Sequence, residues 1–199
     1  MFISFEGIDG SGKSTQARRL ADTLRSRGVT VSLTREPGGS EGAEQIRKLL
    51  VEGRGERWSP ETELLLFTAA RRDHVERLIQ PALARGETVI SDRFADSSRV
   101  YQGLVRAENR QLVEDLHRLV IGIEPDLTCI IDTDPATARG RGAERGGTED
   151  RFESLGLEFQ KRLRAGFLAL AQEFPDRIRL IDGSGSQDEV AARVLAALP

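Results

Sequence analysis

Residues 2–15 read FISFEGIDGSGKST, and this stretch carries the most informative pattern in the chain. A short apolar run leads into the octet from Gly7 to Ser14, which fits G-x-x-x-x-G-K-[ST]. The apolar periodicity that follows predicts a helix over 15–27. The octet therefore lies between a strand and a helix, which is the context of a phosphate-binding P-loop. A glycine-rich turn with a chance Lys-Ser pair is the alternative, and the flanking strand and helix argue against it.

The octet also predicts what each part of the loop does. Glycines let the backbone wrap closely around an anion, and successive N–H groups with the helix N-terminus then face the phosphates. Lys13 supplies a mobile positive charge for the β- and γ-phosphates, and Ser14 offers a hydroxyl to Mg²⁺. The predicted nucleotide-binding residues are Gly7, Ile8, Asp9, Gly10, Ser11, Gly12, Lys13, Ser14 and Thr15.

Composition predicts one globular domain over residues 1–199. The net charge of −3 argues against general binding to nucleic acid or to an anionic membrane surface. A single cysteine, Cys129, excludes an internal disulfide and is expected in the core. The chain opens directly into a strand and has no apolar run of membrane-spanning length. We therefore expect a cytoplasmic protein.

Short apolar strands alternate with helical segments along the whole chain. Strands are predicted at 2–5, 29–33, 88–91, 126–132 and 178–181. Helices are predicted at 15–27, 40–51, 96–104, 109–121, 151–173 and 187–198, with a further helix from 61 that Pro81 kinks or interrupts and a short one from 134. This alternation predicts an α/β fold with a mostly parallel sheet covered on both faces.

Charged side chains follow several of these strands. Parallel sheets bind ligands beyond the carboxyl ends of their strands, where the chain places the P-loop, Arg35, Asp92 and Arg93. Several arginines beside a triphosphate site indicate a second anion, as in transfer of a phosphoryl group between two phosphates. A phosphate acceptor has a second pKa of about 6, so it needs no general base.

Two further groups of residues leave alternatives open at this stage. Arg139, Arg141 and Arg145 lie in a Gly-rich segment without apolar periodicity, either a lid over the phosphates (about 136–150) or a solvated basic loop. Phe67 and Arg71 share one helix face and could hold a base. Taken alone, they fit a core ring and a surface charge better.

The order of several motifs resembles that of the thymidylate kinase (dTMP kinase) family. The motifs are the P-loop stretch, TREPGG at 34–39, LLLFTAARRDH at 64–74, SDRF at 91–94, SSRVYQG at 97–103, and an Arg-rich segment followed by DRFE at 150–153. The resemblance implies transfer from Mg²⁺-ATP to dTMP, giving dTDP, on a P-loop kinase fold with a five-stranded parallel sheet. It also implies a homodimer through helices between about 61 and 121.

The resemblance further implies roles for individual residues. Asp9 would lie near the deoxyribose 3′-OH and the acceptor phosphate, which Arg35 and Arg93 would bind. Phe67 would stack on thymine, with Arg71, Ser98 and Gln102 at the edge of the base, Tyr101 against the sugar and Asp92 at Mg²⁺. No basic residue lies between Gly7 and Lys13, which resembles the bacterial type, in which lid arginines, here among Arg139, Arg141 and Arg145, serve catalysis.

Other readings of the P-loop remain at this point. Another nucleoside or nucleoside monophosphate kinase would differ in the base pocket. A GTP-dependent switch would require N-K-x-D and D-x-x-G motifs as partners of the P-loop, and the sequence does not supply them in that relation. A ligase that uses a P-loop would differ in the second anion site.

Overall fold

The strand that precedes the P-loop lies at the centre of the sheet. The computed structural model describes residues 1–52, 57–106, 109–143 and 156–199. In this part of the chain five strands pair in parallel in the order β2-β3-β1-β4-β5. Their bounds are β1 Phe2–Glu6, β2 Val31–Arg35, β3 Thr88–Asp92, β4 Leu127–Asp132 and β5 Ile178–Asp182. The predicted α/β class and parallel sheet are confirmed.

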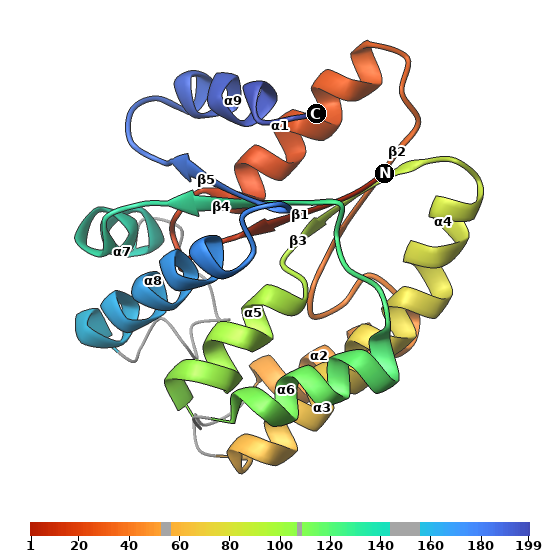
Figure 1. Cartoon of the computed structure of the whole chain (residues 1–199), viewed down its shortest axis with the longest axis vertical. Helices are drawn as coiled ribbons and strands as arrows, with labels where there is room; N and C mark the ends of the chain where they lie inside the picture. Colours follow the sequence, from red (N-terminus) through yellow and green to blue (C-terminus); the bar gives the residue numbers. More distant parts are fainter. Residues whose placement is uncertain (53–56, 107–108, 144–155) are drawn as a thin grey trace.

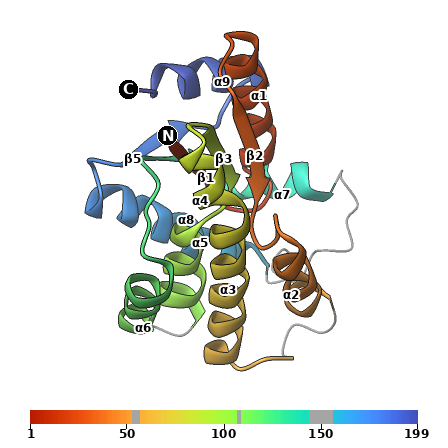
Figure 2. The ribbon, with the colours of Figure 1, turned by 90° about the vertical axis from the view of Figure 1, so that its right-hand side faces the viewer.

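Helices cover both faces of this sheet (Figures 1 and 2). The helices α1 (Lys13–Ser26) and α9 (Gln187–Ala196) lie on one face. On the other face lie α3 (Pro60–His74), α5 (Ala95–Val100), α6 (Arg110–Leu116) and α8 (Gly156–Glu173), with α2 (Glu41–Val51) packed against α3. Helix α7 (Pro135–Ala143) follows β4, beyond the carboxyl end of the sheet.

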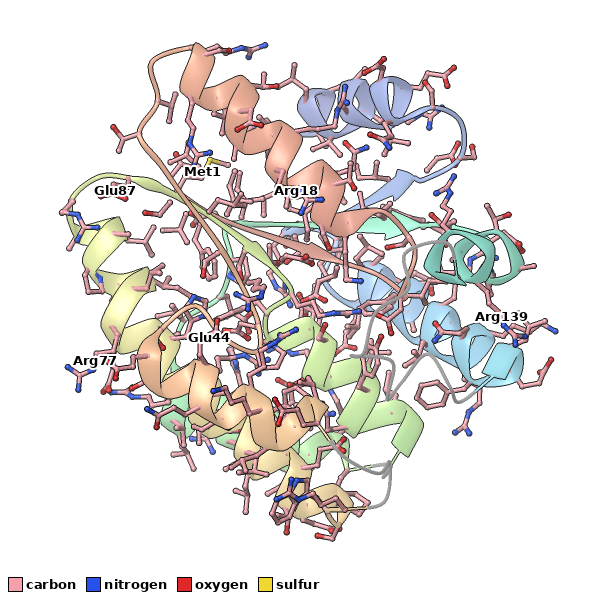
Figure 3. All side chains as sticks on the ribbon, turned by 180° about the vertical axis from the view of Figure 1, so that it is seen from behind. Met1, Arg18, Glu44, Arg77, Glu87 and Arg139 are labelled. Carbon is pink, nitrogen blue, oxygen red and sulfur yellow. The ribbon has the colours of Figure 1, made fainter. Side chains whose placement is uncertain are left out.

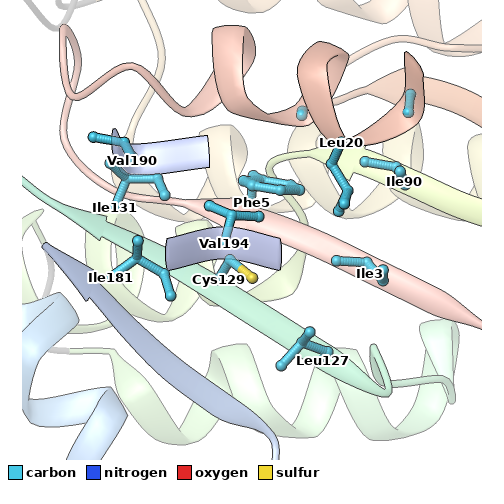
Figure 4. Packing of buried hydrophobic residues seen from close by; sticks show 12 residues of the cluster. Ile3, Phe5, Leu20, Ile90, Leu127, Cys129, Ile131, Ile181, Val190 and Val194 are labelled. Carbon is cyan, nitrogen blue, oxygen red and sulfur yellow. The ribbon is translucent and has the colours of Figure 1, made fainter. Parts of the chain in front are cut away.

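The side chains of strand β1 alternate between two parts of the hydrophobic core, one on each face of the sheet. Ile3 and Phe5 are fully buried against α1 and α9, together with Cys129 (Figure 4). Phe2 packs on the opposite face. Since successive side chains of a strand point to opposite faces, Glu6 shares the face of Phe2 and points toward α5. This places a carboxyl inside the protein, immediately before the P-loop.

The second strand begins two residues later than the sequence predicts. The reason lies at the end of α1, where Gly28 has a φ of 82°. The N–H of Gly28 donates to the carbonyl of Arg25, and the N–H of Val29 donates to that of Leu24. These two bonds form a Schellman motif, so Val29 belongs to the exit of the helix rather than to β2.

The sequence predicts that Pro81 kinks or interrupts its helix, and the structure shows no interruption there. The helix continues from α3 through a π-helical segment, η1 (Val75–Ile79), into α4 (Gln80–Ala84). The wider π-helical turn accommodates the proline ring near the carbonyl four residues earlier. Similar segments, η2 (Tyr101–Arg106) and η3 (His117–Ile121), extend α5 and α6. At its other end α3 begins as predicted, because the Ser59 hydroxyl accepts from the N–H of Thr62 and Pro60 follows.

Candidate active site

The P-loop connects β1 to α1 and leaves the first turn of α1 open to a ligand. Gly12 caps this helix with a φ of 98°, and no side chain among the described residues caps its N–H groups. Gly10 has a φ of 79°, and a Cβ added there would lie 2.0 Å from the Ala138 carbonyl oxygen of α7. The loop therefore packs tightly on α7 while its amide groups remain available to an anion.

Charged side chains of this loop, of the start of α1 and of the residue after β3 form a cluster. The Lys13 ammonium is nearly buried and lies 3.5 Å from Asp9 Oδ1 and 3.3 Å from the carbonyl oxygen of Ile8. Arg93 donates to the same Oδ1, and the Tyr101 hydroxyl donates to Asp9 Oδ2 over 3.2 Å. Burial alone would raise the pKa of Asp9, but the charges of Arg93 and Lys13 outweigh it and lower the pKa to about 2. Asp9 is therefore an anion that holds two cations near one point.

Arg93 reaches this cluster from an unusual backbone conformation. It follows β3 with a φ of 73°, in the left-handed region that residues other than glycine rarely adopt. Its NH1 donates to the carbonyl of Gly7 over 3.2 Å and to the Ser97 hydroxyl over 2.9 Å. The guanidinium thereby connects the P-loop with the start of α5.

Asp92 lies beside the N-terminus of α1. Its neighbour in β3, Ile90, packs in the core under α1, and alternation places Asp92 on the same face. The atom Asp92 Oδ1 is buried and accepts no hydrogen bond from the described residues. An unsatisfied buried carboxylate oxygen fits a divalent cation, and Mg²⁺ uses one or two carboxylates together with phosphate and water. Ser14 lies in the first turn of α1, at the same edge of the sheet.

A second polar cluster surrounds Arg71 on α3. This residue is 5% exposed, so the surface position favoured by its isolated sequence context is wrong. Its Nε donates to Glu36 Oε2 over 2.7 Å, its NH1 to the Ser98 hydroxyl over 3.0 Å and its NH2 to the Phe94 carbonyl. Burial opposes the charge of Glu36, but Arg71 and His74 outweigh it and lower the pKa of Glu36. The fold thus brings Arg71 and Ser98 together.

The remaining base-pocket residues differ in their surroundings. Phe67 is half-buried and lies outside the described core clusters, contrary to the core position that its isolated context favours. Gln102 is 2% exposed, and its amide donates to Glu63 Oε1 over 3.2 Å. Arg35 is exposed at the end of β2 and forms a two-pronged ion pair with Glu44 of α2, at 2.9 and 3.1 Å. Arg35 also lies opposite Asp92 in the strand register.

The Arg-rich segment is partly helical rather than irregular. Arg139 and Arg141 belong to α7, which continues through Gly140 and Gly142 to Ala143. Ala138, on the inner side of this helix, packs against Ile8 of the P-loop. Packing against the loop therefore outweighs the low helix propensity of glycine. Arg139 is exposed and lies at the periphery of the molecule in Figure 3. Arg145 and the DRFE stretch at 150–153 lie outside the described residues.

Sequence reasoning missed the buried carboxylates that support these clusters. Glu6 is fully buried, and burial, followed by repulsion from Asp96, raises its pKa to about 7. Glu36 and Glu63 hold Arg71 and Gln102. The sequence feature that indicated a special role for Glu6 was a charged residue at the end of an otherwise apolar strand. A carboxyl is buried only where other groups form hydrogen bonds or ion pairs with it.

No helix in the described part of the chain is long and apolar enough to cross a membrane.

Comparisons with known proteins give one consistent result. A family model described as thymidylate kinase matches residues 5–194. The thymidylate kinase of Dinoroseobacter shibae is 67% identical over 196 residues, which cover 98% of this chain and 95% of that protein. The thymidylate kinase of Ruegeria pomeroyi is 63% identical, covering 98% and 92%. A crystal structure of thymidylate kinase from Ehrlichia chaffeensis superposes with a TM-score of 0.81 at 38% identity, covering 100% of this chain and 98% of that one.

Proposed function

We infer the work of the individual residues from one premise, which is that this chain belongs to the thymidylate kinase family. It is a kinase that phosphorylates dTMP to dTDP on the route to dTTP, with ATP as the phosphoryl donor. The readings of the sequence as a GTP-dependent switch or as a ligase are thereby set aside. The roles of the individual side chains in substrate binding and phosphoryl transfer are proposed below.

The observation that carries the assignment is the convergence of Lys13 and Arg93 on Asp9. Lys13 belongs to the loop expected to hold the donor phosphates, whereas Arg93 belongs to the strand end expected to hold the acceptor. Asp9 keeps both cations at one point before substrates bind. Phosphoryl transfer depends mostly on such positioning and on neutralising charge. The ionised acceptor phosphate attacks without a general base.

We propose that the residues around Arg71 recognise the acceptor nucleoside. Phe67 would stack on thymine, because its ring is half-buried and lies one helical turn from Arg71. Arg71, Ser98 and Gln102 would contact the edge of the base, and Tyr101 would lie against the sugar. Arg35 would bind the acceptor phosphate after releasing Glu44. The ion pair between Arg35 and Glu44 is exposed to solvent and therefore weak.

The residues present also fit a Mg²⁺ ion. Ser14 and Asp92 would hold it, and the unsatisfied Oδ1 of Asp92 supports this assignment. Mg²⁺ would supply positive charge at the phosphates. We further propose that Arg139, Arg141 and Arg145 belong to a lid at about 136–150. The close packing of helix α7 on the P-loop at Gly10 supports this proposal.

We propose that residues 1–199 act as one catalytic domain, that the protein is cytoplasmic and that it forms a homodimer. Leu65 of α3 and Leu119 of η3 support the dimer, because these large apolar side chains are 53% and 70% exposed. We expect Leu119→Glu to convert the dimer into a monomer in sedimentation experiments. A wild-type protein that sediments as a monomer would contradict the proposal.

A substrate panel tests the assignment of the acceptor site. Transfer from Mg²⁺-ATP is measured to dTMP, dUMP, UMP, dCMP, AMP and GMP. We expect a strong preference for dTMP that Arg71→Ala weakens while KM for ATP stays constant. Lys161→Ala is the control, since this lysine is an exposed surface cation paired with Glu158. An unchanged preference in Arg71→Ala would remove Arg71 from the base site.

A further inference from the structure

The conformation of Arg93 requires support from its surroundings. A residue with a side chain stays at a φ of 73° only where neighbouring groups hold it there. Its guanidinium makes four hydrogen bonds to described residues, and three of them are with the P-loop or with Tyr101, which belong to the proposed substrate site. The fourth, from NH1 to the Ser97 hydroxyl, leads to a residue outside that proposed site.

The Ser97 hydroxyl ends on the buried carboxyl of Glu6. It donates to Glu6 Oε2 over 2.6 Å while it accepts from Arg93 over 2.9 Å. The other oxygen, Oε1, accepts from the N–H of Phe94 over 2.8 Å and from the N–H of Ser97 over 3.2 Å. The Glu6 carboxyl therefore binds two backbone N–H groups that follow Arg93 in the chain. Through the Ser97 hydroxyl it is also linked to the Arg93 guanidinium.

We propose that Glu6, acting through Ser97, is a positioning residue that holds Arg93 in the geometry needed for phosphoryl transfer. Neither Glu6 nor Ser97 is among the residues assigned above to substrate binding. Strand β1 would thus position two groups. It leads directly into the P-loop on the donor side, and through Glu6 and Ser97 it holds Arg93 on the acceptor side. The inference rests on the acceptor-phosphate role proposed above for Arg93.

A purely structural role of the relay is the competing explanation. Glu6 would then only satisfy the N–H groups at the start of α5, and its loss would lower stability without affecting turnover by the folded enzyme. The two explanations differ in kinetics, because misplacing a phosphate-binding group by about 1 Å costs up to about a hundredfold in rate. They also differ in whether Arg93 is needed for the effect.

The primary variant is Ser97→Ala, which removes the relay and keeps Glu6. We expect kcat/KM for dTMP to fall at least about tenfold, with KM for ATP unchanged and the thermal midpoint close to that of the wild type. Ser97→Thr keeps a hydroxyl and is expected to restore most of this loss. Ser32→Ala is the matched control, because the Ser32 hydroxyl also donates to a carboxylate, Glu87, but at the opposite end of the sheet.

A double-mutant cycle with Arg93→Ala decides between the explanations. If the relay acts through Arg93, Ser97→Ala should cost little once Arg93 is absent. An equal loss in both backgrounds overturns the inference while leaving the role of Arg93 intact. If Arg93→Ala alone does not impair transfer to dTMP, the proposed role of Arg93 fails, and this result is visible before Ser97 is changed. Glu6→Gln, measured in the same cycle, should couple to Arg93 in the same direction.

Discussion

Replacing Glu6 by glutamine should change the way stability depends on pH. In the folded protein, burial and the neighbouring Asp96 raise the pKa of Glu6 from 4.5 to about 7. In the unfolded chain this carboxyl is exposed to water, and its pKa returns to its ordinary value. Between these two pH values the folded protein retains a proton on Glu6 that the unfolded chain has lost.

The sign of the effect follows from this difference in bound protons. Stability falls with rising pH wherever the folded state binds more protons than the unfolded state. The contribution of Glu6 is thus fully present below pH 4.5 and is lost as the pH rises through about 7. One pKa unit corresponds to about 1.4 kcal/mol, so the whole contribution is about 3 kcal/mol. Between about pH 6 and about pH 8.5, roughly 1.4 kcal/mol of it should be lost.

Urea unfolding of the ligand-free wild type and of Glu6→Gln measures this change directly. Glutamine has similar size and no proton to lose, so the other titrating groups largely cancel in the difference between the two proteins. The free energy of unfolding of the wild type, relative to the variant, should decrease from about pH 6 to about pH 8.5 by the amount above. A difference that stays constant within about 0.3 kcal/mol would refute the reasoning, because Glu6 would then not titrate in this range.

Further predictions concern the proposed catalytic residues. Lys13→Ala should lower kcat by about a hundredfold or more while the thermal midpoint is retained, and a coupled assay of ADP formation measures it; near-normal turnover would exclude the phosphate role. Phe67→Ala should raise KM for dTMP by about tenfold through lost stacking, with Leu180→Ala, an exposed apolar residue on the edge strand β5, as control; an equal rise in KM for ATP would instead indicate a packing role. Arg139→Ala and Arg141→Ala should lower kcat more than either KM, and if kcat is normal in both variants these arginines are ordinary surface charges.

The P-loop and the alternation of strands and helices along the chain were predictable because their signals are local. The octet at 7–14 needs only neighbouring residues to form, and the five strands are short apolar runs separated by helices. The strand ends at Arg35 and Asp92 were placed together correctly for the same reason, and they lie opposite each other in the register.

The buried charges were not predictable from local pattern. Arg71 is taken out of water by Glu36, which lies 35 residues earlier in the chain, and Glu6 meets Ser97 across 91 residues. Sequence spacing says nothing about such pairs until the fold brings them together. Helix α7 was underestimated for a related reason. Its glycines argue against a helix, but Ala138 packs against the P-loop and stabilises it.

The central position of β1 has a consequence for synthesis on the ribosome. This strand leaves the ribosome before the other four, and its two partners follow much later, since Phe2 pairs with Val89 and Ile3 with Leu127. Translation adds about 5–20 residues per second, so on the order of ten seconds pass before both partner strands of β1 have been synthesised. During that time β1 has an exposed edge without a partner strand, and we expect it to be the part of the nascent chain that most requires a chaperone.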